Sequence, residues 1–331
     1  MRKLLFVPLL IILAVISLLI WWNVNSREVN DKDNTAQPFL ITRGQSASVI
    51  AKNLEKQGLI RSNSVFRLYL EVTGNAEKIQ AGEYTLSPNL NLRAIASLLL
   101  SGPQELWVTY PEGIRREEIA LRTISTLGLK GDQAQIFWDE FIVSSEDHEG
   151  YLFPDTYLFA RDISALKVVN KLKSTFKVKT TEVKSGSLTL EQIVNLASIV
   201  ERETITDEEK PIVAGILTNR LNIGMALQAD ATLQYVTGTR RCGGQTLVEM
   251  LSCQWWVPPT VQDKEIVSSY STYGRRGLPQ GPIGNPGLKS IEAAANSTDS
   301  PYLYYLHDAA GKIHYARTLD EHNENITKYL R

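Results

Sequence analysis

Two carboxylate residues close the most regularly patterned segment of the chain. Glu201 and Glu203 follow an apolar run that begins after Thr189, and Arg202 lies between them. Burial at the edge of an apolar surface disfavours the charged form of a carboxyl group and raises its pKa. A carboxylic acid that keeps its proton near neutral pH can donate it to the leaving oxygen of a glycosidic bond. The alternative is that these side chains are solvated charges on the last turn of a helix.

The segment that carries the two acids, residues 188–204, is predicted to be a helix. Thr189 suits an N-cap, and Gln192 lies three residues on, as a capping box requires. Apolar residues recur at helical spacing: Leu190, Ile193, Val194, Leu196, Ala197 and Val200. At about 100° per residue, Glu201 and Glu203 differ by about 200° and cannot both face one cleft. Glu201 falls within the apolar arc and Glu203 at its rim, so we expect internal hydrogen bonds for Glu201 and substrate contact for Glu203.

The composition is that of a globular protein and excludes several functions. The chain has 331 residues, enough for two domains, of which 43% are hydrophobic and 21% charged. A formal net charge of −1 gives no general attraction to polyanions, which argues against a nucleic-acid partner. The four histidines lie far apart, and the two cysteines form no zinc motif, so we expect no metal. No phosphate-binding loop or dinucleotide fingerprint is present, and we expect no cofactor.

An uncharged stretch of 19 residues, residues 4–22, predicts a transmembrane helix. Arg2 and Lys3 precede it, so the positive-inside rule puts the N-terminus in the cytoplasm and the rest of the chain outside. A cleaved signal peptide is the alternative, but the stretch is long and no small-residue cleavage pattern follows it. We therefore expect a single-pass protein of the cytoplasmic membrane. Outside the cell, Cys242 and Cys253 either form a disulfide or remain two free thiols.

The remaining chain predicts an α+β protein. Residues 23–37 are polar and aperiodic, which indicates a linker. Residues 38–110 alternate strand and helix patterns, and their strand, Gly-containing turn and helix resemble the opening of a LysM-like glycan-binding subdomain. Residues 111–331 are richer in helix patterns and form the predicted catalytic domain. Near their end, residues 302–317 predict a β-hairpin, followed by a helix capped by Thr318.

Two polar and aromatic segments are predicted to be loops that flank the acid. The first spans residues 227–238, and the second is a long segment rich in Gly and Pro that begins near Ser268. Sugars are bound by aromatic faces and by polar side chains, so these residue types suit a glycan cleft. The predicted substrate-binding residues are Gln228, Asp230, Thr232, Tyr235 and Tyr273.

Several motifs in their order resemble the endolytic murein transglycosylase family, also called YceG-like. They are ASIVERET, VAGILTNRLNIGMALQADATLQY, YSTYGRRGLPQGPIGNPGLKSIEAAANSTDSPYLYY and HYARTLDEHN, with GEYTL and GYLFPDTY upstream. The resemblance covers nearly the whole chain after the apolar stretch. The chain departs from the family pattern at Ala231, where the family commonly has proline between Asp and Thr. Residues 242–256 have no counterpart that we recognise.

The resemblance implies a membrane-anchored enzyme that cuts nascent peptidoglycan strands and has a lysozyme-related helical core. In this family the catalytic Glu precedes Ser or Thr, which here is Glu203 before Thr204. Glu203 is then expected to protonate the glycosidic oxygen after N-acetylmuramic acid. The same group would take a proton from the C6 hydroxyl, leaving a 1,6-anhydro end. Glycan strands are the implied substrate, and cell-wall synthases at the membrane are implied partners.

Two other functions remain open at this point. Asp230 is the candidate for a second catalytic acid. Two catalytic carboxylates would make the protein a lysozyme-like hydrolase. Alternatively, the aromatic residues and the LysM-like subdomain would serve a non-catalytic wall-binding or division scaffold, and the acids would be structural.

Overall fold

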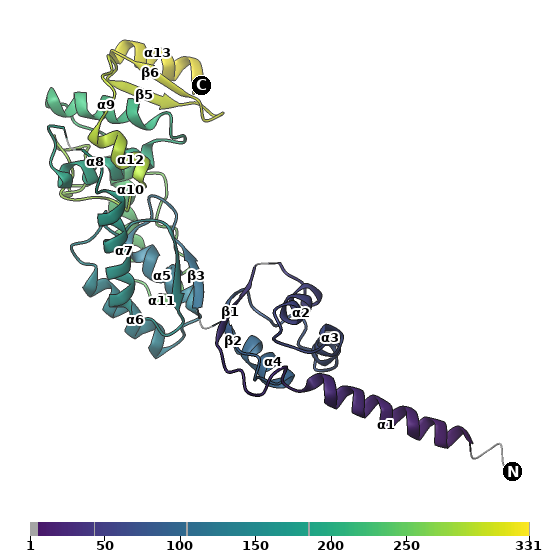
Figure 1. Ribbon diagram of the computed structural model, residues 1–331. Coiled ribbons are helices and arrows are strands. Elements are labelled where there is room, and N and C mark those ends of the chain that lie inside the picture. The colour runs from purple at the N-terminus through teal and green to yellow at the C-terminus, as the bar shows by residue number, and fades with distance from the viewer. Residues whose placement is uncertain (1–5, 43, 104, 185, 331) are drawn as a thin grey trace. The chain divides into compact units, whose positions relative to one another are not determined.

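A computed structural model describes residues 6–42, 44–103, 105–184 and 186–330 of the chain (Figure 1). Two compact units make up the chain. The first contains the residues up to Trp107 together with Leu158–Asp162. The second contains Val108–Tyr157 and the residues that follow Asp162.

Helices and strands alternate in the first unit: α1 (Phe6–Ser26), β1 (Gln37–Ile41), α2 (Ala47–Lys56), α3 (Asn63–Val72), β2 (Gly82–Leu86) and α4 (Leu92–Ser101). The side chains of Ser46, Ser62 and Asn91 cap α2, α3 and α4, each accepting a hydrogen bond from a backbone N–H of the first turn. Strands β1 and β2 pair antiparallel. The strands and helices predicted in this part of the chain are confirmed. No helix of the described residues has the length and hydropathy needed to cross a membrane.

Two further strands, β3 (Glu105–Thr109) and β4 (Thr156–Ala160), complete a sheet in the order β1-β2-β3-β4. Their residues are divided between the two units. The first unit thereby takes Leu158–Asp162 from a stretch that the sequence assigns to the segment 111–331. The order of the strands in the sequence does not show which distant strands pair. The assignment of these residues to the first unit therefore could not be predicted from the sequence.

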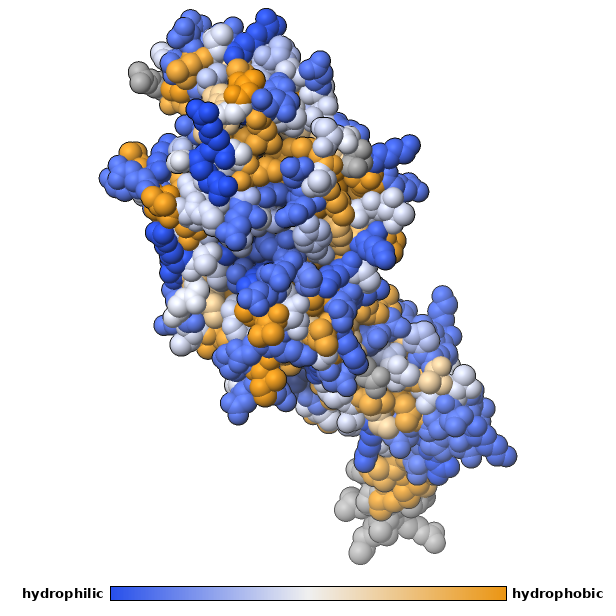
Figure 2. All heavy atoms as spheres, turned by 90° about the vertical axis from the view of Figure 1, so that its left-hand side faces the viewer, coloured by the Kyte–Doolittle hydropathy of each residue, from blue (hydrophilic) through white to orange (hydrophobic). Residues whose placement is uncertain are grey.

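Helices dominate the second unit: α5 (Arg116–Leu127), α6 (Asp132–Ser144), α7 (Ala165–Lys179), α8 (Leu190–Glu203), α9 (Lys210–Asn222), α10 (Asp230–Cys242), α11 (Leu247–Met250), the 3₁₀ helix η2 (Gln262–Glu265), α12 (Leu288–Ala295) and α13 (Leu319–Tyr329). Strands β5 (Tyr304–His307) and β6 (Ile313–Ala316) form the predicted hairpin, and Thr318 caps α13 as predicted. The mixture of helices and small antiparallel sheets confirms the α+β class. Figure 2 shows one face of the molecule, where hydrophilic residues gather across the middle of the second unit.

Helix α8 lies in the core of the second unit. Thr189 and Gln192 exchange hydrogen bonds across its first turn, which confirms the predicted capping box. Residues 193–200 are all buried, and α8 packs against α9, α10 and α12. The two acids at its end therefore belong to a helix that is fixed by packing along most of its length.

The Gly/Pro-rich segment, residues 266–287, is a long loop held against α8. The side-chain amide of Asn195 donates to the carbonyl of Pro279 at 2.8 Å. The hydroxyl of Ser198 accepts a hydrogen bond from the backbone N–H of Ile283 at 3.0 Å. Both bonds are buried, so α8 positions this loop as well as the acids.

Residues 230–238 form most of α10, and the prediction of a loop there is wrong. The face of α10 that packs inward carries Ala231, Thr232, Leu233 and Val236, all buried. Thr232 looks like a loop residue in the sequence, but its hydroxyl donates to the carbonyl of Ala229 at 2.7 Å and is thereby satisfied inside the core. Packing of this face overrides the modest helix propensity of the segment. Asp230 consequently begins a helix.

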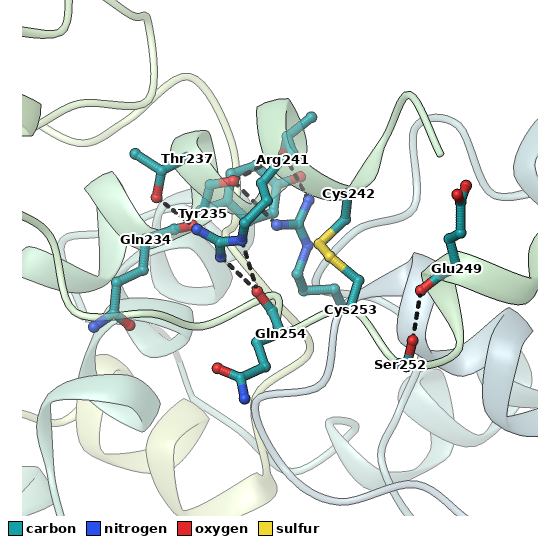
Figure 3. Close-up of a disulfide and its surroundings, with 11 residues drawn as sticks. Gln234, Tyr235, Thr237, Arg241, Cys242, Glu249, Ser252, Cys253 and Gln254 are labelled. Carbon is teal, nitrogen blue, oxygen red and sulfur yellow. Dashed lines mark hydrogen bonds between the residues drawn. A yellow bond between two sulfur atoms is a disulfide. The ribbon is translucent and has the colours of Figure 1, made fainter. Parts of the chain in front are cut away.

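Cys242, at the end of α10, forms a disulfide with Cys253 (Figure 3). Of the two alternatives left open by the sequence, the disulfide is therefore the one observed. The guanidinium of Arg241 donates to the carbonyl of Gln254 at 3.1 Å, just beyond the closed loop. Trp255 follows and is buried. The loop is thus fastened to the end of α10.

Candidate active site

The two acids of α8 have different surroundings, as the helical geometry predicts. The side chain of Glu201 is 9% exposed. One of its oxygens accepts hydrogen bonds from the Ser290 hydroxyl at 2.7 Å and from the backbone N–H of Gly287 at 2.9 Å. Its other oxygen lies 3.4 Å from the ammonium of Lys210. The expectation that internal bonds hold Glu201 is confirmed, and these bonds leave it poorly placed to donate a proton.

Glu203 is half-buried beside the C-terminal hairpin and the start of α10. The hydroxyl of Tyr305 donates to its Oε2 at 2.8 Å, and the backbone N–H of Ala231 lies 3.4 Å from its Oε1. Burial raises the pKa of the Glu203 carboxyl above its usual range, and these two hydrogen bonds oppose that rise. The net direction is upward, so the group can hold a proton at a pH where an ordinary glutamate has lost it.

Asp230 and Tyr273 lie next to this carboxyl group. The hydroxyl of Tyr273 donates to Oδ1 of Asp230. The charge of Asp230 adds to the rise in the pKa of Glu203, because a nearby negative charge disfavours a second one. Burial and the hydrogen bond to Asp230 also raise the pKa of Tyr273. The structure therefore brings three of the predicted site residues together.

Gln228 and Thr232 lie on either side of the start of α10. Gln228 has an exposed side chain and a φ of 51°, a left-handed conformation that non-glycine residues seldom adopt. Its N–H donates to the carbonyl of Thr272 at 3.1 Å, which helps to hold that conformation. Thr232 is fully buried, and its hydroxyl lies 3.0 Å from that of Thr272. Gln228 is therefore open to a ligand, whereas Thr232 joins α10 to the Gly/Pro-rich loop.

Tyr235, one turn further along α10, has other neighbours. Its ring centroid lies 4.9 Å from that of Tyr270, and the guanidinium of Arg115 lies 4.0 Å from its ring. The Tyr235 hydroxyl lies 3.5 Å from a carboxylate oxygen of Glu149. Among the described residues, neither Tyr235 nor Thr232 forms a hydrogen bond with Glu203.

Two residues of this region, Tyr305 and Glu149, were not identified from the sequence. Tyr305 belongs to a predicted strand with several aromatic residues, and nothing in that pattern singles it out. Glu149 is 8% exposed and accepts a hydrogen bond from Asn285 at 2.8 Å. Burial, with the charge of Glu117, raises the pKa of Glu149 to about 8. An acidic residue directly before the apolar stretch GYLFP is the one feature that could have indicated its burial.

The histidines of the second unit are dispersed rather than gathered at one point. His307 lies 3.2 Å from a carboxylate oxygen of Glu209, and His314 lies 2.8 Å from one of Asp308. Within the described part of the chain, no group of three or more His, Cys, Asp or Glu side chains is placed to hold a metal ion.

Known proteins resemble this chain in sequence and in fold. The model of the YceG-like family matches residues 39–328. An endolytic murein transglycosylase of Bacillus subtilis is 30% identical, over 91% of this chain and 87% of that protein. One of Streptococcus pneumoniae is 27% identical over 88% of this chain, which spans 58% of that relative. The crystal structure of a YceG-like protein from Listeria monocytogenes matches with a TM-score of 0.53 at 26% identity, over 88% of this chain and 99% of that one.

Proposed function

This chain belongs to the YceG-like family, and we propose that it is a membrane-anchored endolytic transglycosylase that cuts nascent peptidoglycan strands. The observation that carries the proposal is the half-buried carboxyl group of Glu203, whose pKa is raised by burial. Such a group can supply the proton that cleavage of a glycosidic bond needs. The names of the relatives in Bacillus and Streptococcus support the substrate class.

One carboxyl group performs both proton transfers in the proposed mechanism. Glu203 protonates the glycosidic oxygen that follows N-acetylmuramic acid, and the sugar passes through an oxocarbenium-like state. The resulting carboxylate takes the proton of the C6 hydroxyl, which attacks C1 and leaves a 1,6-anhydro end. Glu203 is then protonated again, and the strand has been cut without consuming water. The hydrogen bonds from Tyr305 and Ala231 stabilise the carboxylate that exists between the two transfers.

The predicted substrate-binding residues take different parts in this proposal. Gln228, Asp230 and Tyr273 contact the glycan beside Glu203, because they lie at the start of α10 or at the loop that faces it. Thr232 is buried and Tyr235 packs on neighbouring rings, so these two position the helix that presents the others.

We also propose the membrane topology expected from the sequence, with residues 1–22 as tip and anchor and 23–37 as linker. The large apolar side chains of α1 from Ile12 to Trp21 are 40–62% exposed, and lipid would cover them. Residues 38–110 then act as a LysM-like glycan-binding subdomain outside the cytoplasmic membrane. Residues 111–331 act as a catalytic domain with a lysozyme-related core around α8. Cell-wall synthases at the membrane are the proposed protein partners.

A pair of substitutions within α8 tests the proposed catalytic role. Glu203→Gln keeps the shape of the side chain but cannot transfer the proton, so cleavage should fall by about 10²–10⁴. Glu201→Gln is the matched control and should cost about 1–3 kcal/mol of stability, because a buried charged acceptor is lost. At matched folded concentration it should retain most of its activity. The readout is release of 1,6-anhydro-muropeptides from uncrosslinked strands, measured by mass spectrometry.

Each other outcome would change the proposal in a defined way. Full activity in Glu203→Gln with loss in Glu201→Gln would move the catalytic role to Glu201. Products with reducing ends would indicate hydrolysis with Asp230 as the second carboxylate. No cleavage by the unmodified protein would favour a non-catalytic wall-binding or scaffold protein.

A further inference from the structure

Arg202 lies between the two acids of α8 and borders a separate hollow. Successive helical residues point about 100° apart, so Arg202 faces a different side from Glu201 and Glu203. The hollow has a volume of about 470 Å³. Its walls come from the stretch before α5, from α5 itself and from the loop that the disulfide closes. It is therefore a concave surface beside α8, next to the residue that precedes Glu203.

Among the described residues, the guanidinium of Arg202 has no hydrogen-bond partner, although the charges of Glu118, Glu201 and Glu203 act on it. It lies over the ring of Trp256, with its central carbon 3.9 Å from the ring centroid. Among the residues that the structure describes, no side chain or carbonyl forms a hydrogen bond or ion pair with it, and its Nε is buried. Arginine offers five donors in a planar fork that matches a carboxylate. Because unpaired buried donors cost free energy, this surface favours a ligand that brings an anionic acceptor.

Trp256, just beyond the disulfide loop, forms the part of the wall that Arg202 contacts. The indole N–H of Trp256 donates to Glu118 at 2.9 Å, which fixes the plane of the ring. A Cβ at Gly238 of α10 would lie 2.2 Å from the carbonyl of Trp255, so the loop and α10 touch directly. This loop lies within residues 242–256, for which we recognise no counterpart in the family pattern.

We propose that this hollow binds the peptide branch of the peptidoglycan strand, with Arg202 pairing to a carboxylate of that branch. The proposal rests on the proposed function, which supplies the substrate. Each N-acetylmuramic acid of peptidoglycan carries a short peptide that has small aliphatic side chains and free carboxylates. Met250, Leu251 and Trp256 line the hollow and offer apolar contact to the aliphatic groups.

The charges around the hollow are compatible with an anionic ligand. Arg122 is a second cation in the lining, and its guanidinium donates to one backbone carbonyl. Two acids also line the hollow: Glu118 accepts the Trp256 N–H and acts on Arg202 through its charge, and Glu112 lies 3.7 Å from the ammonium of Lys210. Arg202 is thus the cation with the most unused donors. Glu203 is the next residue of α8, and the proposal puts the sugar that carries the bound branch near that carboxyl group.

The test compares two uncrosslinked substrates on the full-length protein. One is the native strand, and the other is the same strand with its peptide carboxylates converted to carboxamides. The unmodified protein should cleave the native strand with a kcat/KM at least about tenfold higher, the effect of one charged hydrogen-bonded pair. Arg202→Gln should reduce this ratio to about one, and Arg202→Lys should give an intermediate ratio, because lysine keeps the charge without the fork. Lys171→Gln, an exposed change on α7, should keep the original ratio.

Three results would overturn the proposal. The first is an equal kcat/KM on both strands for the unmodified protein. The second is an unchanged ratio in Arg202→Gln, which would give Arg202 a purely structural role. The third is equally efficient cleavage of strands stripped of their peptides, which would assign the anion to the exposed lactyl carboxylate of the sugar. Failure of the unmodified protein to cleave any strand would instead contradict the proposed function. In that case, binding of a soluble muropeptide that Arg202→Gln abolishes would still support the hollow.

Discussion

Two effects shift the pKa of Glu203 in opposite directions, and the hydroxyl of Tyr305 makes the largest contribution to lowering it. Burial raises the pKa of the carboxyl group, whereas the hydrogen bond from the Tyr305 hydroxyl favours the carboxylate and lowers that pKa. The proposed reaction needs the acid first and the carboxylate afterwards. Tyr305 therefore limits the rise in the pKa of Glu203, which favours the carboxylate that the second step of the proposed reaction needs.

Tyr305→Phe should shift the pH dependence of cleavage. Loss of the hydroxyl removes a donor from the carboxylate, so the pKa of Glu203 rises further and the alkaline limb of kcat/KM moves to higher pH. The maximal rate should fall by about tenfold or more, because a hydrogen bond to a charged group is lost. Rates measured between pH 5 and 9 check both effects. Tyr304→Phe is the control, since Tyr304 points to the opposite face of β5 and stacks on His322. An unmoved alkaline limb in Tyr305→Phe would exclude this role.

Glu149 should make stability depend on pH. Its pKa in the folded protein is about 8, above the ordinary value of 4.5, because burial disfavours its charge. Folding thus favours the protonated form, and the stabilisation is complete below pH 4.5 and is lost as the pH rises through 8. Glu149→Gln mimics the protonated form and does not ionise. From pH 5 to 8 the variant should therefore gain stability relative to the unmodified protein, by at most about 1.4 kcal/mol per pH unit.

Denaturant unfolding at several pH values measures this difference. Glu146→Gln is the matched control, because Glu146 lies in the same connection but is exposed. A difference between Glu149→Gln and the unmodified protein that stays constant from pH 5 to 8 would show that Glu149 does not titrate in this range.

At the scale of elements, the disulfide fixes the loop between α10 and Trp256. Closing a loop between residues 11 apart in sequence should contribute about 3 kcal/mol in the chain-entropy model. Reductant should therefore lower the denaturant midpoint of the unmodified protein. The double variant Cys242→Ser with Cys253→Ser should match the reduced protein and show no response to reductant. A midpoint that reductant leaves unchanged would mean that the closed loop does not stabilise the fold.

At the scale of the whole molecule, the proposed anchor should govern location but not chemistry. Deletion of residues 1–22 should move the protein from the membrane fraction to the soluble fraction. The deleted stretch precedes both the linker and the proposed catalytic domain, so kcat/KM on soluble uncrosslinked strands should stay within about twofold. Fractionation and the anhydro-end assay check the two parts. If N-terminal sequencing of the membrane-extracted protein starts beyond Trp22, the stretch is a cleaved signal and not an anchor.

The sequence by itself determined the features that neighbouring residues encode. The start of α8 follows from Thr189 and Gln192, three residues apart, and its buried face follows from the apolar spacing. The separation of Glu201 from Glu203 follows from helical geometry alone. The hairpin β5–β6 and the cap of α13 are local in the same way.

Only the tertiary structure decided which distant groups meet. Thr232 is buried in α10, where its hydroxyl bonds the nearby carbonyl of Ala229 and also lies 3.0 Å from the hydroxyl of Thr272, 40 residues away. The partner of Glu203, Tyr305, lies 102 residues further along the chain, and Glu149 is bonded to Asn285 across 136 residues. Hydrophobic periodicity and capping motifs predict only contacts between residues that are close in sequence, within a helical turn or a hairpin. A buried polar group can be satisfied by any donor that folding brings within hydrogen-bonding distance, so its partner is fixed by packing rather than by spacing.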